Sequence, residues 1–281
     1  MTLHTTLISV DELAALPVER VLIVDCRTDL TDRTKSPQAY REGHIPGAVY
    51  AHLEDDLSDL SRMSEGLGRH PLPMEQAFGA LLSRWGWRSG MQVVAYDAAG
   101  GALAAARLWW MLRLVGIGDV AVLDGGYQAW LAAGRPIETR VLEREASEVS
   151  VRYDPTQVLF EYRPEASDDL LIDARATPRF RGDVEPLDPV AGHVPGARNR
   201  PFGENLDAQG LFKPAHVLRE EFLALLGNHP AQRIVHMCGS GVTACHNLLA
   251  MEHAGLHGAR LYAPSWSGWV SDRSRPVAKG D

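Results

Sequence analysis

Short apolar runs alternate with amphipathic segments along the chain. The runs VLIVD at 21–25, QVVAYD at 92–97 and VAVLDGG at 120–126 are rich in valine and end at Asp or Gly, which indicates buried β-strands. The segments 74–87 and 102–116 carry apolar residues at helical spacing. This alternation predicts an α/β fold in which a mainly parallel sheet has helices on both faces.

The chain also repeats itself. Four landmarks of the first half recur in the same order in the second half: VLIVDCR and LLIDAR, GHIPGA and GHVPGA, VVAYDAAGG and IVHMCGSGV, and VLDGGYQAW and LYAPSWSGW. We therefore predict two homologous domains, at 1–140 and 155–281. The stretch 141–154 between them is charged and poor in large apolar residues, which is typical of a linker.

Composition narrows the possible partners. The 281-residue chain is 45% hydrophobic and 23% charged, with a formal net charge of −8, so nucleic acid and anionic membranes are disfavoured as partners. A local basic pocket for a small anion remains compatible with this balance. No stretch has the length of a membrane helix, and the N-terminal sequence has no secretory pattern. Three cysteines predict no disulfide framework and fit a reducing cytoplasm.

The stretch VHMCGSGVTACH at 235–246 contains two of the three cysteines, Cys238 and Cys245. A predicted strand ends just before Cys238, and a predicted helix begins at residue 244. The glycine-rich loop between them can turn successive backbone N–H groups inward, and these groups and the helix start favour a thiolate. Cys238 is therefore the predicted nucleophile. Cys245 lies one turn into the helix and is expected to be a buried apolar residue.

A metal site is the alternative interpretation of the same stretch. His236, Cys238, Cys245 and His246 are all ligand types that zinc prefers. However, His236 and Cys238 alternate on a predicted buried strand, and adjacent helical positions point about 100° apart. Convergence of the four side chains on one tetrahedral ion is therefore disfavoured, and we expect no metal.

Together, the doubled domain, the GHIPGA and GHVPGA landmarks, DGGYQAW and the CGSGVT loop resemble the tandem-domain rhodanese family of sulfurtransferases. The resemblance covers nearly the whole chain. The loop is more similar to the 3-mercaptopyruvate sulfurtransferase branch than to the thiosulfate branch. The thiosulfate branch has two basic residues directly after the cysteine, where this chain has Gly239 and Ser240.

The resemblance implies a mechanism without a metal or organic cofactor. The Cys238 thiolate takes sulfur from a small anionic donor and becomes a persulfide. An acceptor then removes the sulfur: cyanide, a small thiol or a reduced thioredoxin-like protein. The inward N–H groups of the loop residues Gly239, Gly241, Val242 and Thr243 are expected to stabilise the outer sulfur. The first domain has Asp97 at the cysteine position and is expected to be catalytically silent.

The family's mercaptopyruvate enzymes bind the donor with two arginines. The first matches Arg179 in the motif PRF, but Leu187 in the motif EPL stands where the second is expected, which puts donor preference in doubt. The resemblance also implies that Ser240 works with a histidine from the first domain, and GHIPG offers His44 for this role. Alternatively, His44 and His193 are structural twins that fix a turn in each domain.

Three other functions remain as alternatives to a mercaptopyruvate enzyme. A thiosulfate sulfurtransferase would use the same chemistry with a different donor. A non-catalytic persulfide carrier would load sulfur once and wait for a protein partner. A phosphatase of related fold needs an arginine six residues after the cysteine, and this chain has Ala244 there.

Overall fold

The computed structural model describes residues 3–29 and 32–281, and these residues form two compact units. The first unit comprises the described residues up to Ser58 together with Pro73–Tyr153 and Ala208–Leu211. The second comprises Asp59–Leu72, Asp154–Asp207 and Phe212–Asp281. A short segment from the first half of the sequence, Asp59–Leu72, thus belongs to the second unit.

The first unit contains a parallel sheet with strand order β1-β5-β4-β2-β3 among the described residues. Its strands are β1 (Leu7–Ile8), β2 (Val21–Asp25), β3 (Val49–Tyr50), β4 (Gln92–Tyr96) and β5 (Val120–Leu123). Every residue of β2, β4 and β5 is buried, which explains why these strands appear in the sequence as continuous apolar runs.

The second unit repeats the same topology. Its parallel strands follow the order β6-β10-β9-β7-β8. They are β6 (Val158–Leu159), β7 (Leu170–Asp173), β8 (Arg198–Asn199), β9 (Ile234–Met237) and β10 (Arg260–Tyr262). The central strands β4 and β9 therefore occupy equivalent positions, and the residues that follow them, Asp97 and Cys238, lie at equivalent sheet edges.

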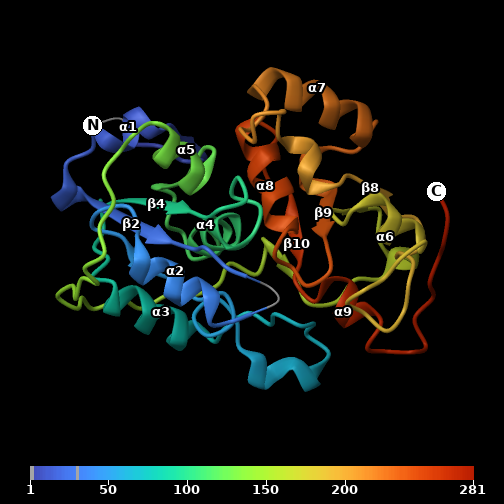
Figure 1. Ribbon diagram of the computed structural model, residues 1–281. Coiled ribbons are helices and arrows are strands. Elements are labelled where there is room, and N and C mark those ends of the chain that lie inside the picture. The colour runs from blue at the N-terminus through green and yellow to red at the C-terminus, as the bar shows by residue number, and fades with distance from the viewer. Residues whose placement is uncertain (1–2, 30–31) are drawn as a thin grey trace. The chain divides into compact units, whose positions relative to one another are not determined.

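Helices flank the strands of each unit (Figure 1). The first unit has α1 (Val10–Ala14), α2 (Lys35–Glu42), α3 (Glu75–Arg84), α4 (Ala104–Leu114), α5 (Gly126–Ala132) and the 3₁₀ turn η1 (Val18–Arg20). The second has α6 (Thr177–Arg181), α7 (Ala215–Leu226), α8 (Ala244–His253), α9 (Ser265–Trp269) and the 3₁₀ turns η2 (Leu60–Glu65), η3 (Pro164–Ala166), η4 (Phe202–Asn205) and η5 (Ala231–Arg233). Helix α4 packs on β4 and β5, and α8 packs on β9 and β10.

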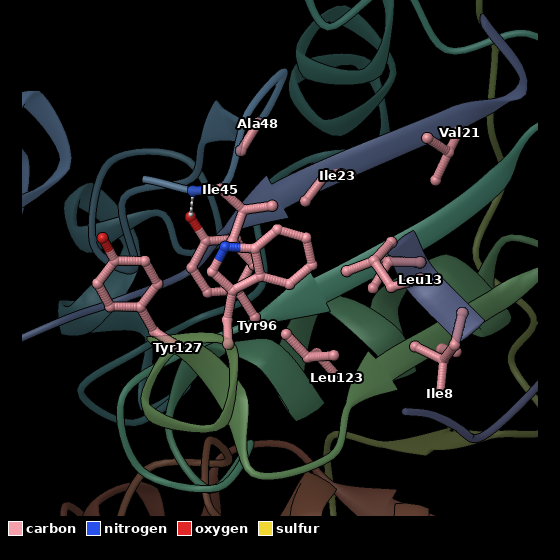
Figure 2. Close-up of a cluster of buried hydrophobic side chains, with 12 residues drawn as sticks. Ile8, Leu13, Val21, Ile23, Ile45, Ala48, Tyr96, Leu123 and Tyr127 are labelled. Carbon is pink, nitrogen blue, oxygen red and sulfur yellow. Dashed lines mark hydrogen bonds between the residues drawn. The ribbon is translucent and has the colours of Figure 1, made fainter. Parts of the chain in front are cut away.

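Each unit has its own apolar core. Figure 2 shows the cluster of the first unit, which combines aliphatic side chains with the aromatic rings of Tyr96, Tyr127 and Trp130. The Tyr96 hydroxyl accepts the N–H of Ile45 at 3.2 Å (Figure 2). It also donates to Asp25 at 2.7 Å, so the buried polar atom has two partners. Burial and the neighbouring Asp25 carboxylate raise the pKa of Tyr96, which therefore stays a neutral donor.

The predicted fold class is confirmed, and the predicted elements lie close to the observed ones. The run 21–25 is β2, the run 92–97 contains β4, and the helix predicted over 102–116 contains α4. The predicted linker 141–154 has no helix or strand, and its backbone bonds to α3, for example from Val149 to the Ser83 hydroxyl. Within the described residues, no helix is long and apolar enough to cross a membrane.

Candidate active site

The predicted nucleophile Cys238 directly follows the central strand β9. Carboxyl ends of parallel strands meet at one sheet edge, where ligands commonly bind. Helix α9 holds the residue in place from both sides: the Cys238 N–H donates to the Ser265 hydroxyl at 3.1 Å, and its carbonyl accepts the N–H of Trp266 at 2.9 Å. Only 1% of Cys238 is exposed, so water does not screen the groups that surround its sulfur.

The loop after Cys238 curves around the sulfur. The Gly241 N–H donates to the Cys238 Sγ at 3.2 Å, and Gly241 adopts a left-handed φ of +77°. The backbone N–H groups of Ser240, Val242 and Thr243 donate to no other residue in the described part of the chain. The predicted loop therefore carries N–H donors beyond the one that already contacts the thiol. That all of them converge on an outer sulfur stays a prediction.

Ser240 is paired with a histidine that the sequence did not single out. The Ser240 Oγ lies 2.8 Å from the Nδ1 of His70. His70 belongs to the segment Asp59–Leu72, which lies against the start of α9 in the second unit. This close approach requires Gly68, which has a φ of +84° and whose added Cβ would overlap the carbonyl oxygen of Pro264.

His44, the histidine expected to partner Ser240, has a structural role in the first unit. Its ring is fully buried, bonds through Nδ1 to the carbonyl of Tyr40 at 2.7 Å and stacks on the Tyr40 ring. His193 repeats this arrangement, with its Nδ1 2.8 Å from the Phe180 carbonyl and its ring stacked on Phe180. The expected pairing is thus corrected to His70, and the alternative that His44 and His193 are structural twins agrees with the structure.

Arg179, the predicted donor-binding cation, lies beside the Cys238 loop. A Cβ added to Gly239 would lie 3.6 Å from the Arg179 Nη1. The Nε and Nη2 atoms of Arg179 bond to Glu185, with the shortest distance at 2.6 Å. Burial raises the pKa of Glu185, but its hydrogen bonds with Arg179 and backbone N–H groups outweigh this and hold the pKa below its usual value. Leu187 is 57% exposed and contributes no charge.

The other two cysteines are buried in structural positions. Burial and the Asp25 carboxylate raise the pKa of the Cys26 thiol well above its usual value, which suppresses the reactive thiolate. The Cys245 Sγ donates to the carbonyl of Gly241 at 3.5 Å. Cys26, Cys238 and Cys245 form no disulfide with one another.

The side chains considered as metal ligands have other partners. The Nε2 of His236 lies 3.0 Å from the Met251 sulfur, and the Nδ1 of His246 lies 3.1 Å from the Asn205 amide. Burial lowers the pKa of His236 to about 3, so its ring is neutral. Across residues 3–29 and 32–281, no three His, Cys, Asp or Glu side chains are grouped as a metal would need.

Sequence reasoning missed His70 and its neighbour Arg69, whose Nη2 would lie 3.1 Å from a Cβ added to Gly239. Both residues lie in the stretch GLGRHPLP, which has no helical or strand periodicity. Two basic residues between glycines and prolines were the only local signal. Their approach to the loop depends on contacts far along the sequence, such as the bond from the Arg69 N–H to the Ser267 hydroxyl at 3.0 Å.

Comparison with known proteins agrees with this geometry. The sequence profile of the rhodanese-like domain matches residues 9–133 and 158–272. The chain is 45% identical to a Pseudomonas aeruginosa protein named "Probable 3-mercaptopyruvate sulfurtransferase", over 98% of both chains. It is 41% identical to a Mycobacterium tuberculosis protein provisionally named thiosulfate sulfurtransferase SseB, over 98% of this chain and 97% of that protein. The structure of 3-mercaptopyruvate sulfurtransferase from Leishmania major superposes with a TM-score of 0.82 at 31% identity, over 94% of this chain and 73% of that one. The chain belongs to the rhodanese family, with two rhodanese-like domains in tandem.

Proposed function

We propose that this protein is a sulfurtransferase that moves sulfur from 3-mercaptopyruvate to a thiol-type acceptor through a persulfide on Cys238. The Cys238 thiolate attacks the donor's sulfur and forms an S–S bond while the donor's C–S bond breaks. The carbon keeps the bonding electrons, takes up a proton and leaves as pyruvate. The position of Cys238 after β9, inside a loop of N–H donors, supports this assignment.

The hydrogen bond between Ser240 and His70 is the observation that favours 3-mercaptopyruvate as the donor. A departing pyruvate carbanion or enolate needs a proton, and a hydroxyl bonded to an imidazole can relay one. Sulfite leaving from thiosulfate is a stable anion and needs no such relay. A serine–histidine pair two residues past the nucleophile therefore favours a carbon leaving group.

The second half of the reaction returns the enzyme to its thiolate. A nucleophilic acceptor attacks the outer sulfur of the Cys238 persulfide and releases the cysteine. Cyanide, a small thiol or a reduced thioredoxin-like protein has the required nucleophilicity. We place the reaction in the cytoplasm because three cysteines without a disulfide between them fit a reducing compartment.

The division of labour between the domains follows from one residue. Asp97 occupies the position in the first domain that is equivalent to Cys238 in the second, and a carboxylate cannot form a persulfide. We therefore assign catalysis to the domain over 155–281 and treat the domain over 1–140 as catalytically silent. The names of the Pseudomonas aeruginosa and Leishmania major relatives support mercaptopyruvate as donor.

Thiosulfate is the second candidate donor. Two observations favour it: Leu187 replaces the expected second arginine, and the Mycobacterium tuberculosis relative has a thiosulfate name. Thiosulfate would use the same Cys238 persulfide, with sulfite as the leaving group. The two donors therefore differ only in the first half-reaction.

Steady-state turnover with each donor separates the two candidates. We expect a higher kcat/KM with 3-mercaptopyruvate, and Ser240→Ala should lower that value by about 10²-fold because the proton relay is lost. The same variant should lower turnover of thiosulfate by much less, and Ser274→Ala, at an exposed serine, serves as the matched control. A higher kcat/KM with thiosulfate would favour the second candidate. Turnover of neither donor would overturn the assignment.

A further inference from the structure

The donor site lacks a cation at the position where the family resemblance leads one to expect it. Leu187 is exposed, and its N–H donates to Glu185 at 3.1 Å. Arg179 has its Nε and Nη2 engaged by carboxylates, which leaves Nη1 as the edge that faces the loop at Gly239. A single guanidinium edge is a weak clamp for a carboxylate, because the strong Arg–carboxylate pairs use two parallel N–H donors.

Arg69 brings a second guanidinium to the same place. Its Nη2 is 3.1 Å from the position that a Cβ on Gly239 would occupy, and the Arg179 Nη1 is 3.6 Å from that position. Both groups therefore lie over the residue that follows Cys238. The backbone N–H of Arg69 donates to the Ser267 hydroxyl, so helix α9 positions Arg69 as well as Cys238.

One carboxylate holds the two arginines side by side. Asp188 accepts from the Arg69 Nη1 with one oxygen and from the Arg179 Nη2, at 3.2 Å, with the other. The Asp188 side chain is only 2% exposed, which fixes the geometry. The Arg69 Nε and Nη2 and the Arg179 Nη1 donate to no described residue, and both side chains keep some exposure, at 27% and 18%.

We infer that Arg69 is a donor-binding residue that replaces the missing second arginine of the carboxylate clamp. The inference rests on the proposed function, because it concerns the carboxylate of a mercaptopyruvate-type donor. Arg69 and Arg179 each offer unused N–H donors beside Gly239, and a planar carboxylate can accept from both. The clamp is thus built from two distant parts of the sequence, 59–72 and 177–188, and Leu187 is not needed for it.

The test compares Arg69→Met and Arg69→Lys with Arg273→Met, which removes an exposed arginine of the same unit. Three quantities are measured: KM and kcat for 3-mercaptopyruvate, and the inhibition constant of pyruvate, a carboxylate without transferable sulfur. Arg69→Met should raise KM and the inhibition constant by about tenfold to a hundredfold, with a much smaller change in kcat. Arg69→Lys should be intermediate, because it keeps the charge but loses the fork. Arg273→Met should match the wild type.

Two results would overturn the inference. In the first, KM and the inhibition constant stay at wild-type values in a folded Arg69→Met protein. In the second, kcat falls while pyruvate inhibits as before, which would assign Arg69 to support of its neighbour His70. Thermal unfolding of Arg69→Lys, which keeps a cation near Asp188, shows whether any loss reflects misfolding. If the wild type turns over no mercaptopyruvate, the proposed function fails, and that result is distinct from a failure of Arg69 alone.

Discussion

The two units have different residues at equivalent loop positions, Asp97 and Cys238, and the difference shows what such a loop can bind. After β4, the fully buried Asp97 carboxylate accepts four backbone N–H groups, from Ala99 at 2.8 Å, Gly101 at 2.9 Å, Leu103 at 3.1 Å and Ala105 at 3.2 Å. After β9, the Cys238 Sγ accepts one, from Gly241. Burial raises the pKa of Asp97, and the four N–H groups oppose this by stabilising the charged form. The loop of the first unit therefore surrounds a carboxyl group, and that of the second surrounds a shorter side chain.

Covalent geometry explains why the second loop has donors to spare. The outer sulfur of a cysteine persulfide stands as many bonds from Cβ as a carboxylate oxygen of aspartate does. A persulfide on Cys238 would therefore reach about as far into its loop as Asp97 reaches into the first. The N–H groups of Ser240, Val242 and Thr243, which donate to no other described residue, are the donors available there. The first unit thus displays a loop whose N–H groups bind a carboxyl group, and we propose that the second unit uses the equivalent loop to bind the persulfide.

The hydrogen bonds that hold Asp97 and Cys238 in place are also equivalent in the two units. The carbonyl of Asp97 accepts the N–H of Tyr127, as the carbonyl of Cys238 accepts that of Trp266, each at 2.9 Å. The residue before each donor is left-handed: Gly126 has a φ of 59° and Ser265 a φ of 52°. A serine in this conformation is strained. Its hydroxyl binds the Cys238 N–H, a contact for which a glycine has no atom.

The largest effect on sulfur transfer is expected when Cys238 is replaced by aspartate, the residue found at the equivalent position of the first loop. Cys238→Asp should lower sulfur transfer by at least about 10³-fold, since a carboxylate forms no persulfide. The folded state should persist, because the loop's N–H groups can bind the carboxylate as they do Asp97. Turnover with both donors and a thermal unfolding curve test this. Measurable turnover would mean that another group carries the sulfur.

Removing the carboxylate of the first loop disrupts that loop and leaves the second loop unchanged. Asp97→Ala leaves four buried N–H groups without an acceptor and should cost about 2–4 kcal/mol in the free energy of unfolding. Sulfur transfer per folded molecule should stay within about twofold of wild type. Urea unfolding and turnover are measured, with the exposed Asp11→Ala as control. A loss of turnover as large as that of Cys238→Asp would show that the first domain takes part in catalysis.

Acid should affect the stability of the two units differently, because the strands before the two loops carry different residues. β9 carries His236 where β4 carries Ala95, and burial lowers the pKa of His236 to about 3 from its ordinary value of 6.5. Below pH 6.5, His236 binds a proton in the unfolded chain but stays neutral in the folded chain. Stability is therefore lost as the pH falls toward 3, by up to about 1.4 kcal/mol per pH unit.

His236→Leu should remove this contribution, because leucine fills similar space and does not titrate. The measurement is the free energy of unfolding at several pH values from 7 to 4, compared between variant and wild type. An identical pH dependence in the two proteins would show that His236 is not buried neutral. His229→Leu, at a partly buried histidine of the same unit, is the control.

The smallest effect is expected at the left-handed residue that supports Cys238. Ser265→Gly loses the hydroxyl but gains a relaxed backbone, whereas Ser265→Ala loses the hydroxyl and keeps the strain. The alanine variant should therefore unfold with about 1 kcal/mol less free energy than the glycine variant. Equal stabilities would show that the positive φ costs nothing at this site.

Local sequence patterns predicted the repeated sheets and the position of Cys238 between a strand and a helix, because buried strands and glycine loops depend on neighbouring residues. Cys238 follows a continuous apolar strand and precedes a helix, and Arg179 lies in a short recognisable motif. His70 and Arg69 could not be predicted, since their segment has no periodicity and is placed by distant partners such as Ser240 and Asp188. His44 was the expected partner of Ser240 because it lies in the recognisable motif GHIPG, whereas His70 lies in a stretch without one.

Mapping the transferred sulfur tests the central claim most directly. The wild-type protein is incubated with one equivalent of 3-mercaptopyruvate or of thiosulfate, digested, and each cysteine peptide is sequenced by mass spectrometry. The account predicts one added sulfur atom on Cys238 and none on Cys26 or Cys245, both of which are buried in structural positions. Added sulfur on Cys26 or Cys245, or none on Cys238 in protein that turns over, would contradict it.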